Sequence, residues 1–203
     1  MSIAGLVLAS VLTPATFGRA EAKALVEALG DEGQNGTAVA DVEIVLQPDG
    51  HVASCAVVDS GGDSAIVERM CPKIMRFKVD GVARVDGEPA YGRFRTRMVV
   101  FDGSMPRMQP MAPNYTLTVA AMPKGTGPKV DVQIVAHVAA DGQVLECAGV
   151  NGRLTGFYAA ACGQLGPDLL KPVIDGAGTS VPYVAYMSMR FVGPDEAGSG
   201  VEK

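Results

Sequence analysis

Residues 41–55 read DVEIVLQPDGHVASC, and residues 131–147 read DVQIVAHVAADGQVLEC. Each stretch begins with an Asp before alternating apolar residues, continues to an Asp-Gly pair, and reaches a cysteine five residues after that glycine. Alternation predicts a strand, and an Asp-Gly pair between two such runs predicts a β-hairpin. Because the same pattern occurs twice, the sequence predicts that one small module is duplicated.

The similarity between the two stretches continues beyond the first cysteine. A second cysteine comes 16 residues later in the first stretch and 15 residues later in the second. A turn rich in Gly or Pro and a last alternating strand then complete each copy. These last strands are expected at residues 91–101 and 183–192.

Each copy is predicted to fold as a β-β-α-β module of the α+β class. Its first two strands form the hairpin, and a polar loop leads to a helix, at residues 65–74 in the first copy, with Asp63 or Ser64 as the N-cap. The helix then packs on one face of a small antiparallel sheet that the last strand completes. The expected architecture is two tandem β-β-α-β modules, whose edges could pair with each other as in a two-fold dimer.

The rest of the chain is assigned around these two copies. A first helix is expected at residues 20–29, where Gly30 can end it. We expect a signal peptide or short apolar leader at 1–22, a helix and connector at 23–37, the first module at 38–103, a Pro/Met linker at 104–115, the second module at 116–193 and a flexible tail at 194–203.

Residues 3–17 form an uncharged, mostly apolar run. The run is shorter than the roughly 20 residues that a membrane-spanning helix needs, but its length is typical of the apolar region of a signal peptide. Ala20 and Ala22 give the small-x-small pattern of a cleavage site, although no Lys or Arg precedes the run. We therefore expect export to the periplasm or cell envelope. The alternative is that the run is a buried strand or helix of the folded domain.

Composition argues against several classes of function. The net charge is -5, aromatic residues make up 5 % of the chain and Trp is absent, which disfavours binding of nucleic acid or stacking on sugars. The chain has two His, and it contains no nucleophile–His–carboxylate set, phosphate loop or zinc-protease motif. We expect a protein that is not an enzyme and has no cofactor.

Four cysteines can pair in three ways. The duplication selects Cys55 with Cys71 and Cys147 with Cys162, because each pair then joins the hairpin of a copy to the helix of the same copy. Such disulfides are typical of exported proteins and would stabilise small cores. The alternatives are four reduced cysteines in a cytosolic protein, a zinc site and a catalytic thiol. The sequence lacks the closely spaced cysteine pairs that zinc sites use, and a catalytic nucleophile would rarely be present in both copies.

The ordered pattern of both copies resembles a known family, the TonB carboxy-terminal domain, in the cysteine-bearing variety of energy-transducer-like proteins. In the first copy the matching residues are Val45, Asp49, Gly50, Val52, Cys55, Val57, Ser60, Gly61, Cys71, Phe77, Gly87, Pro89 and Val99. In the second copy they are Val135, Asp141, Gly142, Val144, Cys147, Cys162, Gly176, Val181 and Met189.

The resemblance implies a periplasmic domain that recognises peptides of outer-membrane receptors. Such domains add an extended partner segment to the exposed edge of their last strand, which offers unpaired N–H and C=O groups. The candidate edges here are residues 91–101 and 183–192. The expected partner is a protein or peptide of the envelope, and contact with a membrane is expected only through the amino-terminal segment, if it is not cleaved.

Arginines alternate along the first candidate edge, so their side chains point to one face of the sheet. A basic stripe of this kind suits an acidic peptide, a lipid head group or a polyanion. The alternative is a solvated face whose charges protect the edge from aggregation. The predicted partner-binding residues on the two edges are Arg93, Arg95, Arg97, Tyr183, Met187 and Met189.

The linker supplies an alternative function. Met105, Met108 and Met111 recur every third residue among prolines. A polyproline II segment has three residues per turn, so the three thioethers would lie on one side of it. Because thioethers select Cu(I), this arrangement indicates a periplasmic metal-handling protein. The other interpretation is a linker that packs its methionines into a groove between the modules.

Overall fold

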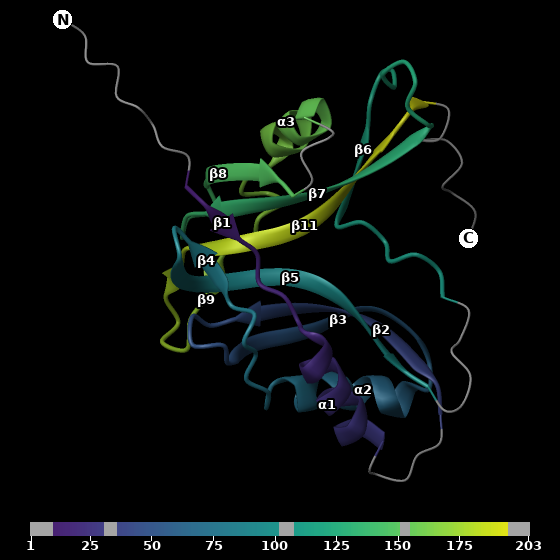
Figure 1. Cartoon of the computed structure of the whole chain (residues 1–203), viewed down its shortest axis with the longest axis vertical. Helices are drawn as coiled ribbons and strands as arrows, with labels where there is room; N and C mark the ends of the chain where they lie inside the picture. The colour runs from purple at the N-terminus through teal and green to yellow at the C-terminus, as the bar shows by residue number, and fades with distance from the viewer. Residues whose placement is uncertain (1–9, 31–35, 102–107, 151–154, 195–203) are drawn as a thin grey trace, which may run out of the picture.

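The computed structural model describes residues 10–30, 36–101, 108–150 and 155–194 (Figure 1). The helices in these ranges are α1 (Arg19–Gly30), α2 (Ser64–Ile74) and α3 (Thr155–Gln164). The strands are β1 (Leu12–Thr13), β2 (Ala38–Leu46), β3 (Val52–Gly62), β4 (Ala83–Val85), β5 (Glu88–Val100), β6 (Tyr115–Thr118), β7 (Lys129–Val138), β8 (Val144–Gly149), β9 (Val173–Ile174), β10 (Ser180–Val181) and β11 (Tyr183–Val192).

The described chain is mostly β, and nine of its strands form one sheet. Its central order is β3-β2-β5-β11-β7-β8, while β4 and β1 extend from one end of β5, and β6 pairs with β11. The predicted α+β fold of two separate β-β-α-β modules is therefore wrong. Two small sheets would each leave an edge of unpaired backbone groups, and pairing β5 with β11 satisfies part of both edges at once.

The junction between the two halves is a parallel pairing of β5 with β11. It begins with Tyr91 opposite Tyr183 and ends with Phe94 opposite Tyr186. The idea that two edges pair with each other is thus confirmed. Along its length β11 also pairs with β7, and its last residues pair with β6, while β5 pairs with β2 on its other side.

The helices α2 and α3 cover opposite faces of this sheet (Figure 1). Met70 of α2 belongs to one buried cluster with Ile44, and Tyr158 of α3 belongs to another with Val45. Successive residues of a strand point to opposite faces, so these neighbours on β2 show that the two clusters lie on either side of the sheet. The protein therefore has two hydrophobic cores separated by a shared sheet.

Local sequence signals form the expected turns and helix ends. Asp49 accepts a hydrogen bond from the His51 N–H, and Gly50 has φ 88°, which suits glycine in the hairpin turn. Asp63 caps α2 by accepting hydrogen bonds from the N–H groups of Ala65 and Ile66. The predicted N-cap and the predicted helix at residues 65–74 are confirmed within one residue.

The amino-terminal segment is part of the folded structure from residue 10 onward. The predicted helix at residues 20–29 is confirmed as α1, and β1 pairs with β4. Ala15 is only 1 % exposed, so this part of the predicted leader packs in the first core. None of the described helices is long and apolar enough to cross a membrane. Residues 1–9 and the tail from 195 lie outside the described residues.

Candidate functional site

Three arginines of β5 and two carboxylates of β2 lie on the sheet face opposite α2. We call this set, Asp41, Glu43, Arg93, Arg95 and Arg97, the arginine face. Phe94 and Met98, which alternate with the arginines, are buried in the first core on the other side. The prediction that the arginines share one face is thus confirmed, but the sequence analysis did not pair them with the carboxylates of β2.

Arg97 forms a two-pronged ion pair with Asp41, its partner in the register of β5 and β2. Its Nε lies 2.6 Å from Asp41 Oδ1, and its Nη2 lies 2.8 Å from Oδ2. The Asp41 side chain is only 3 % exposed. The hydrogen bonds to Asp41 raise the pKa of Arg97 above its usual value, so this guanidinium stays charged. Arg97 also donates a hydrogen bond to the carbonyl of Gln109 in the linker.

Arg93 connects the sheet to the segment that precedes β9. Its Nη2 donates to Glu43 Oε1 at 2.6 Å, and its Nη1 donates to the Lys171 carbonyl at 3.0 Å. Burial alone lowers the pKa of Arg93, but the hydrogen bond and charge of Glu43 outweigh it and raise the pKa. The hydroxyl of Tyr183 donates to the same Lys171 carbonyl. Arg93 is therefore held by the fold and is not a free cation.

Arg95 lies between these two ion pairs and differs from both of its neighbours. Its partner in the register is Glu43, which bonds to Arg93 instead. The Nε of Arg95 is buried and has no hydrogen-bond partner in the part of the chain that the structure describes. A buried donor without a partner lowers the stability of the fold, so Arg95 is the energetically unfavourable member of the arginine face.

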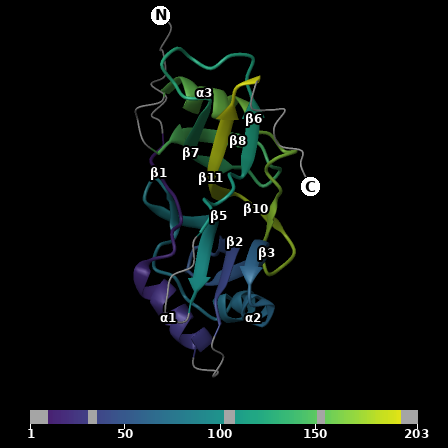
Figure 2. The same cartoon turned by 90° about the vertical axis from the view of Figure 1, so that its right-hand side faces the viewer.

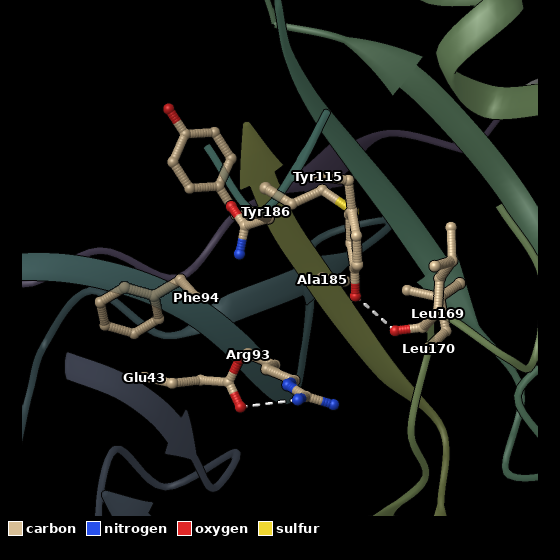
Figure 3. Close-up of a pocket in the computed structure, with 10 residues that line it drawn as sticks. Glu43, Arg93, Phe94, Tyr115, Leu169, Leu170, Ala185 and Tyr186 are labelled. Atoms are coloured by element: carbon tan, nitrogen blue, oxygen red, sulfur yellow. Dashed lines mark hydrogen bonds and ion pairs between the residues drawn. The ribbon is translucent and has the colours of Figure 1, made fainter. Parts of the chain in front are cut away.

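Three hollows border the arginine face. One of about 220 Å³ lies beside Arg97 and Met108, and one of about 310 Å³ lies beside Arg93 and Ile174. The third, about 20 Å³, lies where β5 and β11 part, and it has room for a single water molecule. Figure 3 shows Tyr115 closing this third hollow, with its hydroxyl bonded to the Leu169 carbonyl at 2.5 Å.

The second predicted edge is closed. Tyr183, Met187 and Met189 are 0 %, 5 % and 0 % exposed and belong to the second core. β11 has strands on both sides, so neither its backbone edge nor these side chains are open to a partner. The first predicted edge is closed over residues 91–94, where β11 pairs with it. Both edges were assigned on the basis of separate modules, and the pairing between the halves occupies residues 91–94 of the first and 183–186 of the second.

The strands at the two ends of the central order, β3 and β8, have open edges instead. Within the described ranges β3 pairs only with β2, and it lies on the side of β2 away from β5 (Figure 2). Its 11 residues include no Lys, Arg or Pro, the residues that commonly block edge pairing. Val57 and Val58 on this strand are 39 % and 46 % exposed. The sequence analysis missed this edge, although the absence of Lys, Arg and Pro at 52–62 is visible in the sequence.

Both predicted disulfides are present. Cys55 and Cys71 join β3 to α2 with an S–S distance of 2.01 Å and a Cα–Cα distance of 5.4 Å. Cys147 and Cys162 join β8 to α3 with distances of 1.97 Å and 5.8 Å. Both Cα–Cα distances are within the usual range for disulfides, and no cysteine is left free. They contradict the alternatives of reduced cysteines, a zinc site and a catalytic thiol.

The structure describes two of the three methionines of the linker. Met105 lies outside the described residues, Met108 is 39 % exposed and Met111 is half-buried. No group of three or more His, Cys, Asp or Glu that could hold a metal occurs among the described residues. The copper hypothesis stays a prediction that these positions do not test.

Comparison of the chain with models of known families, with curated proteins and with solved structures found no match. The resemblance to the TonB carboxy-terminal domain therefore stays a prediction from the sequence pattern. A functional proposal has to depend on the geometry of this chain.

Proposed function

We propose that the protein is a non-enzymatic binding protein of the cell envelope that recognises an extended peptide by strand addition at the outer edge of β3. The observation that carries this proposal is the length and exposure of that edge: 11 residues that pair on one side only. A peptide laid along β3 gains main-chain hydrogen bonds from groups that otherwise face water.

The side chains along this edge indicate which side chains the added peptide should carry on each of its faces. Val57 pairs with Val42 in the register, and Val42 is buried in the first core beneath α2. An added strand would therefore place apolar side chains beside Val57 on the α2 face. Its alternate side chains would lie beside Ser54 and Asp59 on the other face, where polar residues are favoured.

The disulfide between Cys55 and Cys71 supports this use of β3. It fixes the middle of the edge strand to α2, so little backbone freedom remains to be lost when a peptide binds. Two disulfides in a chain of this size are also typical of an oxidising compartment. Export to the periplasm is the localisation that this chemistry favours.

The test compares two lysine substitutions at exposed apolar residues on the open edges of β3 and β8. Val57→Lys places a charge where the added strand would pack, and Leu145→Lys places the same charge on β8, where Leu145 is 61 % exposed. Wild-type protein and both variants are used to capture partners from an envelope extract. Val57→Lys should weaken capture of the bound protein at least tenfold, and Leu145→Lys should leave it unchanged.

Two results would contradict the proposal. Equal capture by Val57→Lys and wild type would show that the partner does not use the edge of β3. Loss of capture with Leu145→Lys alone would move the site to β8. Circular dichroism and the count of disulfides in each variant show that differences in capture do not come from unfolding.

A further inference from the structure

Residues 11–16 are themselves an extended segment added to the edge of β4. Leu12 lies opposite Val85 and Thr13 opposite Arg84 in an antiparallel pairing. The Val11 N–H donates to Asp86 Oδ1 at 2.8 Å, and its carbonyl accepts from the Asp86 N–H at 3.0 Å. This segment is bound in the manner that strand addition uses.

The end of the segment extends this ladder to Gly81. The Thr16 N–H donates to the Gly81 carbonyl at 2.9 Å. A Cβ on Gly81 would lie 2.4 Å from the Thr16 carbonyl oxygen, which no real side chain allows. The absence of a side chain at Gly81 is therefore what lets the segment approach β4 so closely.

The floor of the groove is shaped for one small side chain. Ala15 lies over Gly92 of β5, where a Cβ would lie 2.6 Å from the Ala15 Cβ and 2.9 Å from the Ala83 Cβ. Leu12 and Phe17, three residues before and two after Ala15, pack against the first core. The groove thus accepts a small residue in its centre and apolar residues on either side.

We propose that this groove, which we call the β4 groove and which is formed by Gly81, Ala83, Gly92 and the edge of β4, is a peptide-binding site that residues 11–17 occupy within the chain. Removal of the predicted leader at residues 1–22 would empty it. Its ligand is then an extended segment of a partner protein, with a small residue over Gly92 and apolar residues three before and two after. This site is separate from the edge of β3, and the proposal does not depend on the proposed function.

The chemistry of the emptied groove supports a partner segment. Cleavage after Ala22 would leave the N–H of Asp86 and the carbonyl of Gly81 without their present partners. It would also uncover the apolar floor beneath Ala15, which is now 1 % exposed. An extended peptide can form hydrogen bonds with the unpaired backbone groups and fill the apolar hollow with a side chain at the same time.

The experiment opens the groove in the full chain. Ala15→Trp cannot fit between Gly92 and Ala83, so it should displace the segment without removing it. Thr13→Trp is the matched control, because Thr13 is exposed and the same side chain there leaves the segment bound. Binding of a fluorescent peptide with the sequence of residues 10–18 is measured by anisotropy, alongside a peptide that carries Trp in place of its Ala15.

The Ala15→Trp protein should bind the peptide with Ala at least tenfold more tightly than wild type or Thr13→Trp does, because their own segment competes at high effective concentration. It should not bind the peptide with Trp. Adding Gly92→Ala to Ala15→Trp should abolish binding by filling the floor. Equal binding by Ala15→Trp and wild type, with circular dichroism and disulfides unchanged, would overturn the proposal. An intact mass that shows residues 11–17 retained in the protein from its native compartment would also overturn it.

Discussion

Tyr91 and Tyr183 lie opposite each other, in register, at the start of the parallel pairing between β5 and β11. Tyr183 is the first residue of β11, and Tyr91 is the fourth residue of β5. This single contact between strands merges the two halves into one sheet and places α2 and α3 on opposite faces. It also closes residues 91–94 of the first edge and 183–186 of the second edge that the sequence pattern assigns to a partner, and leaves β3 and β8 at the two ends of the central strand order.

The disulfides should protect all four cysteines in the native protein. Titration of the folded protein with a thiol reagent is expected to find no free thiol, and four should appear after unfolding and reduction. Replacing both Cys55 and Cys71 with Ala should lower the free energy of unfolding by about 3 kcal/mol, because the disulfide closes a loop across 16 residues. Reactive thiols in the untreated native protein would contradict the pairing.

The ion pair of Arg97 should matter more for stability than that of Arg190. Arg97→Met leaves Asp41 buried and unpaired, so the free energy of unfolding should fall by about 3–5 kcal/mol in urea denaturation. Arg190 makes the same two-pronged pair with Asp131, at 2.7 and 2.8 Å, but Asp131 is 55 % exposed. Arg190→Met should therefore cost less than about 1 kcal/mol. Equal costs would contradict the role of burial.

Stability should depend on pH through Asp131. The hydrogen bond from Arg190 holds the pKa of this carboxyl below its usual value. A depressed pKa in the folded state stabilises the fold above the unfolded-state pKa of about 3.9, and this stabilisation is lost as pH falls through the lower folded-state pKa. Asp131→Asn should flatten the acid side of the curve of unfolding free energy against pH. An unchanged slope below about pH 4 would contradict the assignment.

Arg95 should be a residue whose replacement stabilises the protein. Arg95→Met keeps the apolar stem and removes the buried Nε that lacks a partner. The free energy of unfolding should rise by about 1 kcal/mol, since the cost of an unsatisfied buried donor is removed. Urea denaturation of Arg95→Met beside wild type measures this change. A loss of stability would show that Arg95 has a favourable role in the fold.

Local sequence signals predicted the local structure. The turn at Asp49 and Gly50, the cap of α2 at Asp63 and the pairing of the cysteines each depend on residues close together or on one repeated spacing. The assembly depends on contacts between the halves instead. Pairing of Tyr91 with Tyr183 joins distant strands in parallel, and such a pairing leaves no turn motif in the sequence.

The candidate site could be predicted only in part, because local patterns show which face a side chain is on but not which strand lies beside it. Alternation placed Arg93, Arg95 and Arg97 on one face, because side chains of a strand alternate whatever its neighbours are. Their pairing with Asp41 and Glu43 depends on the register between β5 and β2, which alternation does not fix. The closed edge of β11 and the open edge of β3 follow from the order of strands in the merged sheet.

Hydrogen exchange of the complex with the captured partner tests strand addition at β3 most directly. Amide protons on the outer side of residues 52–62 should exchange at least tenfold more slowly in the complex than in the free protein, because the added strand supplies their missing acceptors. The amides of β8 should exchange at the same rate in both states. Equal exchange of β3 in the free and bound protein, with protection elsewhere, would contradict the proposed mode of recognition.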